Sequence, residues 1–571
     1  MRNLAVQFVE NEKIQKKKMR KIIPIFVFAL CAASIFSTAA TRSNKSDISR
    51  NLNIFNSIYK ELQINYVDTI DANKTIRKAI DAMLMEIDPY TEYIPEEDQE
   101  AFRLISTGEY GGIGSVIMQR NGNVYISEPY EGSPAQKAGL RPGDLIMVVD
   151  GDTVLGLTTD KVSNKLKGQA GTNLSITVKR PYVNDSILTF DITRAKIQVN
   201  PVPYYGVIRG DIGYIGLTTF NENSANEVKN ALIELKKDPR VKSIILDLRN
   251  NGGGLLESAV KIVGLFVPKN TEVLRTRGKG QFNEKVYKTT TKPVDTETPL
   301  AVLINTGTAS SAEIVSGALQ DLDRAVIIGT RSFGKGLVQS TRPLPYNGVL
   351  KVTTAKYYIP SGRLIQAIDY SHRNADGSVA RTPDSLTNVF KTANGREVRD
   401  GGGITPDISI TFPESNRLVY NIVVNNWAFD YANRFAATTQ SILSPEEFEI
   451  TDSIYADFKK FIDPEKFKYD KVCEMRLSEL KKAAEVEGYM NDSVKVQFEA
   501  LEKMLRHDLD KDLDTHRKEI SEYLSSEIVM RYYYQKGQVI DALRTDIVVD
   551  SAMNVLHNDA KYKSILNPLK K

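Results

Sequence analysis

The chain has 571 residues, 41% of them hydrophobic and 26% charged, proportions typical of a soluble globular protein with several domains. Its net charge of +4 is concentrated at the start, because seven Lys or Arg and only two Glu fall within residues 1–21, which leaves the remainder slightly acidic. A basic body that would bind nucleic acid is therefore excluded. Cys31 and Cys473 are the only cysteines, so disulfides and cysteine metal sites are excluded from a mature chain that begins after residue 40.

Residues 22–36 form an apolar stretch behind the basic start, and small residues follow it. A basic flank, a short apolar run and then small residues predict a cleaved export signal. The stretch is shorter than the about 20 apolar residues of a membrane helix, although a span over residues 22–40 also suits a retained anchor. We expect residues 1–40 to be a signal peptide or membrane anchor, with Met1 or Met19 as the true start. The protein is then exported to the periplasm or cell envelope.

Residues 45–100 are expected to form a helical N-terminal arm. Apolar residues recur at helical spacing, as in Ile54, Ile58 and Leu62, and the pattern closes at Pro89. Such an arm packs on the body or on a second copy of the chain. A homo-oligomer is the expected assembly.

Residues 101–195 predict a small β-rich module of short strands, with one short helix before Gly139 and another near Thr159. Its sequence, including Ser133-Pro-Ala and Gly139-Leu-Arg-Pro-Gly-Asp, resembles a PDZ domain of the type embedded in bacterial proteases. A PDZ domain adds an extended peptide end to its sheet as a strand, and the amides of a glycine-containing loop hold the terminal carboxylate. The residues that match this loop in position are Gly111, Gly112, Ile113 and Gly114. Taken alone, these glycines are equally consistent with a tight turn.

Residues 200–412 alternate apolar strand-like runs with helical patterns, which predicts an α/β architecture. Residues 415–571 are rich in Lys, Glu, Asp and Leu at helical spacing and predict a helical C-terminal extension with a structural role. The expected fold class is therefore multidomain α/β.

Ser310 and Lys335 carry the sharpest chemical signal. Ser310 follows the apolar run 300–304 at the start of a helix-like pattern, and Lys335 lies 25 residues further on, after the apolar run 325–328. A serine hydroxyl needs a base to take its proton, and a desolvated lysine can be that base. The chain holds only four histidines, three of them in the charged C-terminal region, so a Ser-His-Asp triad is poorly supplied. A Ser-Lys dyad is the sharper hypothesis.

Lys335 also fits a different motif. Gly329 and Gly334-Lys335 after an apolar strand match a P-loop through its lysine. The next residue is Gly336, where a Ser or Thr is needed to ligate magnesium, and only Asp247 could be put forward as the acidic partner. Nucleotide binding is the weaker hypothesis, and a solvated loop lysine is the plain alternative.

Three further segments are distinctive sequence motifs: 247–254 (Asp-Leu-Arg-Asn-Asn-Gly-Gly-Gly), 308–315 (Thr-Ala-Ser-Ser-Ala-Glu-Ile-Val) and 332–339 (Ser-Phe-Gly-Lys-Gly-Leu-Val-Gln). Joined to the PDZ-like module, they resemble the C-terminal processing proteases, the carboxyl-terminal serine peptidase family with a crotonase-like core. The likeness covers residues 45–412. It implies that residues 200–412 are a serine protease core.

The resemblance implies a role for each residue of the site. Ser310 is the nucleophile, Lys335 the general base, and Gln339 orients the lysine amine from one helical turn further on, if that segment is helical. The family commonly reads Ser-Ala-Ser-Glu where this chain has Ser-Ser-Ala-Glu, so Ser311 competes with Ser310 as the attacking residue. The spacing to Lys335 and Glu313 favours Ser310.

The glycine run of residues 252–254 has a catalytic role in this interpretation. A tetrahedral intermediate needs amide donors aimed at its oxyanion, and glycine lets the backbone approach closely. One donor is expected from Gly253 or Gly254 and another from Ser311. A plain strand-to-helix turn is the alternative. Asp247 and Arg249, just before the glycines, either order this loop through an ion pair or cap a helix.

The sequence therefore predicts an exported serine endopeptidase that selects substrates by their C-terminal ends and cuts them with a Ser310-Lys335 dyad. Its expected partners are protein or peptide C-termini, with no nucleic acid, no metal and no cofactor. The alternative is a non-catalytic scaffold of the cell envelope that binds peptides through the PDZ-like module.

Overall fold

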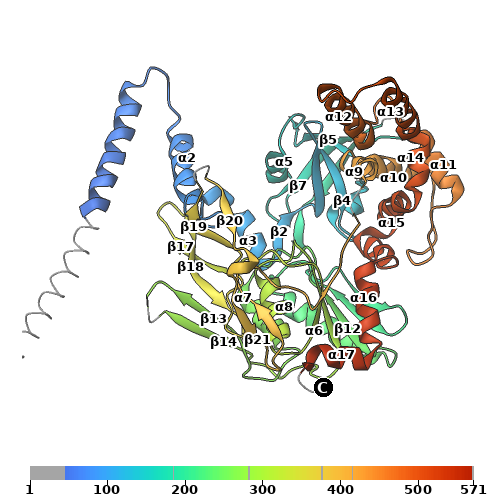
Figure 1. Cartoon of the computed structure of the whole chain (residues 1–571). Helices are drawn as coiled ribbons and strands as arrows, with labels where there is room; N and C mark the ends of the chain where they lie inside the picture. The colour runs from blue at the N-terminus through green and yellow to red at the C-terminus, as the bar shows by residue number, and fades with distance from the viewer. Residues whose placement is uncertain (1–45, 184–185, 281–282, 375–376, 414–415, 569–571) are drawn as a thin grey trace, which may run out of the picture. The chain divides into compact units, whose positions relative to one another are not determined.

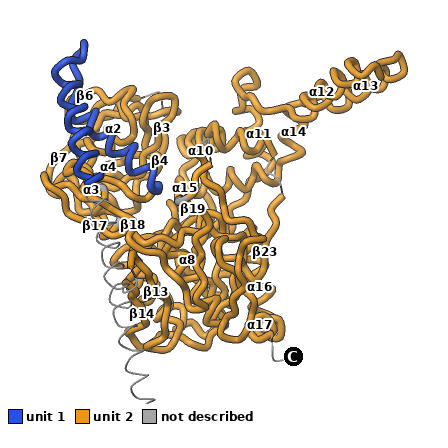
Figure 2. Tube along the Cα trace, turned by 60° about the vertical axis from the view of Figure 1, so that its left-hand side comes forward, with its two compact units in different colours: residues 1–89 blue, residues 90–571 orange. Residues whose placement is uncertain are grey.

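The computed structural model describes residues 46–568 apart from the gaps 184–185, 281–282, 375–376 and 414–415. The predicted export signal or anchor within residues 1–40 lies outside these ranges. Within them, no helix is both long enough and apolar enough to cross a membrane. The chain divides into two compact units, residues 1–89 and 90–571 (Figure 2).

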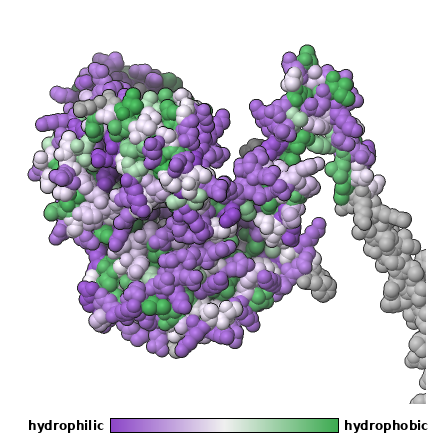
Figure 3. All heavy atoms as spheres, turned by 180° about the vertical axis from the view of Figure 1, so that it is seen from behind, coloured by the Kyte–Doolittle hydropathy of each residue, from purple (hydrophilic) through white to green (hydrophobic). Residues whose placement is uncertain are grey.

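The described part of the first unit is helical, over residues 46–65 and α2 (Ala72–Met85). Leu52, Phe55 and Ile58 have 50–63% of their surface exposed, and Figure 3 shows apolar side chains on these helices. The helices of the first unit end at Met85, before Pro89, which cannot continue a helix. The rest of the arm predicted for residues 45–100 belongs to the second unit, where it forms a strand and short helical segments.

The β-rich module has a six-stranded antiparallel sheet in the order β3-β4-β5-β7-β8, with β6 paired to β5. Its elements are β3 (Ser115–Arg120), β4 (Asn123–Pro129), α4 (Pro134–Ala138), β5 (Leu145–Val149), β6 (Asp152–Thr153), α5 (Thr159–Leu166), β7 (Asn173–Lys179) and β8 (Ile187–Thr193). A two-stranded ribbon of β2 (Glu109–Gly112) and β9 (Ala195–Gln198) encloses the module in the sequence. Both predicted helices are present, and the first ends at Gly139, whose φ of 94° favours glycine.

The α/β region contains a second six-stranded sheet in the order β10-β11-β12-β15-β16-β23, parallel from β11 onward. The strands are β10 (Tyr204–Ile208), β11 (Ile212–Gly216), β12 (Ser243–Asp247), β15 (Leu300–Ile304), β16 (Val326–Gly329) and β23 (Ile408–Ser409). The three helices between them are α6 (Ser224–Lys237), α7 (Leu256–Val263) and α8 (Ser311–Asp321). The predicted strands and helices of this region are present with small differences at their ends.

Both faces of this sheet are covered, which explains why its strands read as continuous apolar runs. Ile244 and Leu246 point into a core with α6, α7 and α8, whereas Ile245 points to the other face. That other face is covered by α16 (Ile547–Leu556) and α17 (Asp559–Leu566) from the end of the chain. The C-terminal extension therefore supplies part of the α/β core itself (Figure 1).

An antiparallel five-stranded sheet lies beside the core in the order β1-β18-β13-β14, with β17 also paired to β18. Its strands are β1 (Glu92–Ile94), β13 (Glu272–Gly278), β14 (Glu284–Lys288), β17 (Leu337–Pro343) and β18 (Val349–Tyr358). Two small hairpins follow, β19 (Ile368–Arg373) with β20 (Val379–Arg381) and β21 (Val389–Lys391) with β22 (Glu397–Arg399). Two short helical segments, η1 (Glu96–Asp98) and α3 (Gln99–Thr107), precede the β-rich module. A third, η2 (Asp384–Leu386), lies between the two hairpins.

Five of the remaining helices share an apolar cluster: α9 (Arg417–Val424), α10 (Trp427–Thr438), α11 (Asp452–Phe461), α14 (Leu509–Thr515) and α15 (Arg517–Ala542). The other two, α12 (Val472–Val486) and α13 (Asp492–Leu505), contact each other. This helical region also contacts the β-rich module, because Arg120 on β3 pairs with Asp430 at 2.6 Å. The expected multidomain α/β class, with helical ends and an inserted β-rich module, agrees with this architecture.

Candidate active site

Ser310 lies at the N-terminus of α8, where the chain turns sharply from β15 into the helix. Its φ of 56° and ψ of −117° fall outside the regions that non-glycine residues prefer. Such strain persists only where the surroundings impose it, and it is concentrated at functional sites. The side chain of Ser310 is half-buried. The strained turn therefore holds a partly accessible hydroxyl at a fixed position.

Ser311 is placed differently from its neighbour. Its side chain is 1% exposed, and its hydroxyl donates a hydrogen bond to the carbonyl of Gly254 at 2.8 Å. A hydroxyl committed to a buried carbonyl is not presented to a substrate. Of the two adjacent serines, Ser310 is the one with an accessible hydroxyl, and Ser311 fastens α8 to the glycine run.

The glycine run lies directly against the start of α8. A Cβ at Gly253, whose φ is 95°, would lie 2.8 Å from Ser310 Cβ and 2.9 Å from Ser311 N, so only glycine fits. The N–H of Gly253 itself donates to Asn251 Oδ1 at 2.9 Å. Among the described residues, the N–H of Gly254 and that of Ser311, the first residue of α8, have no acceptor. Of the two predicted glycine donors, Gly254 is the one left available.

Lys335 occupies the loop between β16 and β17, and its half-buried side chain extends over an aromatic ring. Its Nζ lies 4.1 Å from the centroid of the Tyr90 ring. Among the described residues, the hydroxyl of Ser310 forms no hydrogen bond with this amine. The two predicted catalytic side chains are therefore brought to one site without being joined directly.

Glu313 joins the backbones of these two residues. One carboxylate oxygen, Oε2, accepts the N–H of Ser310 and the N–H of Lys335, each at 2.8 Å. The other, Oε1, accepts the N–H of Gly334 at 2.7 Å and the hydroxyl of Ser332. The side chain is completely buried, and this burial raises the pKa of Glu313 although the four hydrogen bonds oppose the shift. A buried carboxylate thus fixes the loop of Lys335 to the turn of Ser310.

Tyr357 on β18 contacts the same two residues from their carbonyl side. Its hydroxyl lies 2.8 Å from the carbonyl oxygen of Lys335 and 3.2 Å from that of Ser310. Burial raises the pKa of Tyr357 well above its usual value, and the charge of Glu313 adds to the shift, so the phenol stays protonated and able to donate. No role was predicted for Glu313 itself, which entered only through its spacing from Ser310. The Ser-x-x-Glu spacing of a helix capping box was the signal that could have identified its role.

Gln339 does not lie on a helix. Residues 337–343 form β17, so the expected reach of Gln339 to Lys335 across one helical turn is wrong. Alternation along a strand and pairing with β18 override that spacing, and the Gln339 amide donates to Thr353 Oγ1 at 3.0 Å. A role for Gln339 in orienting the lysine would need a different route.

The P-loop interpretation of Lys335 does not agree with the structure. A P-loop needs a helix after the glycine loop and free amides that surround phosphates. Here β17 follows the loop, and the amides of Gly334 and Lys335 are bonded to Glu313. The amides of Gly334 and Lys335 are therefore not available to bind a phosphate.

Asp247 and Arg249 form part of an ion-pair network next to the glycine run. Arg249 binds both carboxylate oxygens of Asp247, and its Nη2 also lies 2.7 Å from Asp546. Asp546 is the N-cap of α16. The C-terminal helices are thus attached to the residue that directly precedes the loop of Gly253 and Gly254.

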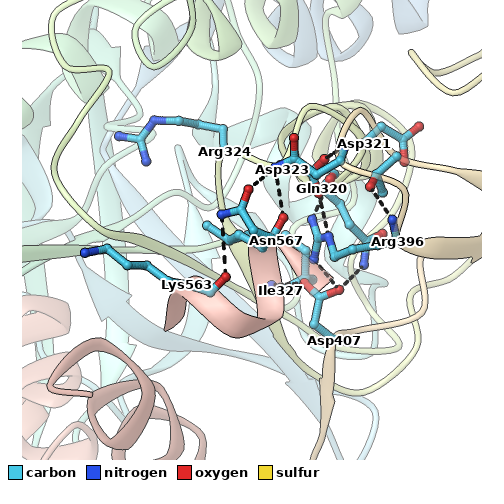
Figure 4. Close-up of polar contacts among 12 residues, drawn as sticks. Gln320, Asp321, Asp323, Arg324, Ile327, Arg396, Asp407, Lys563 and Asn567 are labelled. Atoms are coloured by element: carbon cyan, nitrogen blue, oxygen red, sulfur yellow. Dashed lines mark hydrogen bonds and ion pairs between the residues drawn. The ribbon is translucent and has the colours of Figure 1, made fainter. Parts of the chain in front are cut away.

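The far end of α8 is held by a second buried network (Figure 4). Arg396 pairs with Asp323 at 2.6 Å and with Asp407 at 2.7 Å, while Gln320 also donates to Asp407 at 3.0 Å. Arg363, 1% exposed, pairs with Asp321 at 2.9 Å. These arginines neutralise acidic side chains at the negative end of the helix dipole. The helix that carries Ser310 at its start is therefore immobilised at both ends.

The predicted peptide-binding loop is only partly a loop. Gly111 and Gly112 belong to β2 and pair with Lys196 and Ala195 of β9. Ile113, 3% exposed, and Gly114, with φ of 72°, form the turn into β3. This β3 is the edge strand of its sheet, and α5 packs beside it. A free strand edge beside a helix is the geometry that accepts an added peptide strand.

Among the described residues, no group of three or more His, Cys, Asp or Glu side chains could hold a metal ion. The site as described consists of a serine, a lysine, a buried carboxylate and a glycine run.

Three family models match the chain: "Peptidase family S41" over residues 211–372, "PDZ domain" over 125–180, and "Probable PDZ-protease, C-terminal helical domain" over 418–556. A carboxy-terminal-processing protease of Bartonella bacilliformis is 38% identical over 355 residues, which is 61% of this chain and 81% of the relative. A probable CtpA-like serine protease of Staphylococcus aureus is 31% identical over 473 residues, 81% of this chain and 84% of the relative. Among solved structures, the photosystem II D1 C-terminal processing protease is 28% identical, with 62% of this chain and 87% of that chain covered and a TM-score of 0.35.

Proposed function

The chain belongs to the carboxy-terminal-processing proteases of peptidase family S41, and we propose that it is a serine endopeptidase that captures protein C-termini and cleaves them with Ser310 and Lys335. The observation that carries this proposal is the shared carboxylate of Glu313, which binds the backbone N–H groups of both residues. It keeps the backbones of the two residues within one rigid frame, and a fixed relative position is what a nucleophile and its base require.

The chemistry follows from these groups. The neutral amine of Lys335 takes the proton of the Ser310 hydroxyl as the oxygen attacks the substrate carbonyl carbon. The oxyanion that forms is stabilised by the amides of Gly254 and Ser311. The lysine ammonium then gives its proton to the leaving amine, and an acyl group remains on Ser310. Water, deprotonated by the same lysine, hydrolyses this ester and restores the serine.

Substrate capture is assigned to the PDZ domain. An extended C-terminus would pair with the open edge of β3, and its carboxylate would meet the turn at Ile113 and Gly114. Val116 on β3 is 40% exposed, which gives the groove an apolar contact for the tail. We assign the substrates to proteins with apolar C-terminal residues.

Export and assembly are proposed from the N-terminal segments. Residues 22–40 would direct the chain to the periplasm or cell envelope, as a cleaved signal or as an anchor. The exposed apolar side chains on the helix of residues 46–65 would pack against a second copy, which gives a homo-oligomer.

The test is cleavage of an unstructured protein that ends in a small apolar tail. The wild type is compared with Ser310→Ala, Lys335→Ala and Ser311→Ala, and binding of a fluorescent tail peptide is measured in parallel. We expect no cleavage with the first two variants, reduced cleavage with the third, and unchanged tail binding in all of them. Full activity of Ser310→Ala would refute the mechanism. Tail binding without cleavage by the wild type would favour a scaffold.

A matched pair of variants tests capture separately. A Cβ at Gly114 would lie 2.6 Å from Ser133 Cβ, whereas Gly122 has open space around it at a similar φ of 75°. Gly114→Ala should weaken tail binding and raise the KM for the tailed substrate, with Gly122→Ala as control. Equal tail binding by both variants would show that the turn at Gly114 does not take part in capture.

A further inference from the structure

Tyr90 contacts the residue proposed as the general base. The Nζ of Lys335 lies 4.1 Å from the centroid of the Tyr90 ring, well within the about 6 Å at which a cation is attracted to an aromatic face. This attraction acts on the charged ammonium and hardly at all on a neutral amine. An ammonium held in this way cannot accept the proton of a serine.

The ring of Tyr90 is itself held in place. It packs edge-on against Tyr370 of β19, with centroids 5.8 Å apart, and the two hydroxyls lie 3.2 Å from each other. The next residue, Thr91, accepts the N–H of Thr353 at 3.2 Å, and β1 then pairs with β18. Tyr90 is therefore a fixed surface for the lysine amine.

The same segment is linked to Gln339. The Oγ1 of Thr353 accepts the Gln339 amide at 3.0 Å and lies 3.5 Å from the Oγ1 of Thr91. Tyr90 thus contacts Lys335, the proposed base. The adjacent Thr91 contacts Thr353, which is the hydrogen-bond partner of Gln339. Tyr90 and Thr91, neighbours in the chain, are therefore linked to both groups.

We propose that Tyr90 is a positioning residue that holds the Lys335 ammonium in a protonated resting arrangement, from which the amine must be released before Ser310 can be activated. The proposal rests on the proposed function, because it assigns Tyr90 a role through the proposed base. Ionisable groups near Lys335 include Glu313 on α8 and Tyr357 on β18, which bind its backbone, and Tyr370 behind the ring of Tyr90.

The effect of the ring is measured in the pH dependence of kcat/KM. Loss of the ring makes the charged amine less stable, so the acid limb of the profile moves to lower pH. We expect Tyr90→Leu to shift this limb by about 0.5–1 pH unit, since a partly desolvated cation–π contact has roughly this strength. Tyr90→Phe keeps the ring face and should leave the limb close to that of the wild type.

A second pair of variants separates the electrostatic effect from packing. Phenylalanine and pentafluorophenylalanine at position 90 have nearly the same shape, but fluorination removes the negative face of the ring. We expect the fluorinated variant to shift the acid limb as Tyr90→Leu does. This pair also decides the matter if Tyr90→Leu does not fold.

The ionisation of Lys335 can also be followed without any catalysis. In Ser310→Ala protein with ¹³C-methylated lysines, the Lys335 signal is identified by its loss in the Lys335→Ala variant and titrated by NMR. It should titrate at lower pH with the fluorinated ring than with phenylalanine. An identical titration with both rings would overturn the role of Tyr90, even in an active protease. If the wild type cleaves nothing, the proposed function fails while this titration still tests Tyr90.

Discussion

The backbone N–H groups of Ser310 and Lys335 converge on a single oxygen atom, the Oε2 of Glu313, at 2.8 Å each. The two residues are 25 positions apart in the chain and belong to different loops of the core sheet. Tyr357 links their carbonyl groups on the other side. The backbones of the proposed nucleophile and of its base are therefore fixed relative to each other.

Glu313→Gln should disrupt this frame. The amide keeps one acceptor oxygen and replaces the other with an NH₂ group that faces backbone donors, and each donor left unsatisfied costs about 1–3 kcal/mol. We expect a lower free energy of unfolding in urea and a kcat reduced at least about tenfold, because misplacement of reacting groups is costly. Glu257→Gln, on α7 away from this network, is the control. Unchanged kcat in Glu313→Gln would show that the frame does not position the catalytic groups.

Gly253→Ala should remove most of the activity, whereas Gly252→Ala should not. The new Cβ would meet Ser310 Cβ at 2.8 Å and would push the glycine run away from α8. If this run supplies an oxyanion donor, kcat should fall by about 10²–10³-fold. Gly252 has open space at its Cβ position, so Gly252→Ala is the matched control and should stay close to wild type. Equal activities would exclude the glycine run from the site.

Asp546→Asn tests the link between the C-terminal helices and Arg249, which precedes the glycine run of residues 252–254. Asparagine caps a helix as well as aspartate does, so the variant removes the charge that faces Arg249 and keeps the cap of α16. We expect the free energy of unfolding to fall by about 1–3 kcal/mol and kcat to decrease. Asp550 lies on α16 and forms a more exposed ion pair with Arg209. Asp550→Asn should therefore lower the free energy of unfolding by less than Asp546→Asn does. The reverse order would contradict a structural role for Arg249–Asp546.

Asp295→Asn should show a defined pH dependence of stability. Burial alone would raise the pKa of Asp295, but hydrogen bonds from Lys236 and Thr298 outweigh it and hold the pKa at about 2. The folded value is below the unfolded value, so the stabilisation is present above pH 4 and is lost as the pH falls toward 2. A shift of this size corresponds to about 2 kcal/mol at neutral pH.

Urea unfolding of the wild type and Asp295→Asn at pH 7 and at pH 3 provides the measurement. The difference in free energy of unfolding should shrink as the pH falls. Asp238→Asn is the control, because Asp238 pairs with Arg240 at the surface and solvent screens the loss. A difference that stays constant with pH would mean that charge at Asp295 is not the cause.

Much of the fold was predictable because its signals are local. Apolar runs such as 300–304 belong to strands covered on both faces, and the first helix of the PDZ domain ends at a glycine, Gly139, as its sequence indicates. The helical spacing assumed around Gln339 failed because pairing with β18 imposed a strand. Local spacing does not reveal a cross-strand partner, so this error could not be seen in the sequence.

Sequence by itself determined the family, the order of the domains and the residue types available for chemistry, because motifs and hydrophobic periodicity are properties of short segments. Only the tertiary structure decided how those residues meet. The burial of Ser311, the shared oxygen of Glu313, the contact of Lys335 with Tyr90 and the reach of Asp546 to Arg249 all join segments far apart in the chain or depend on burial. Such contacts arise from packing of whole elements, and of them only the bond between Glu313 and Ser310 has a local signal, the Ser-x-x-Glu spacing of a capping box.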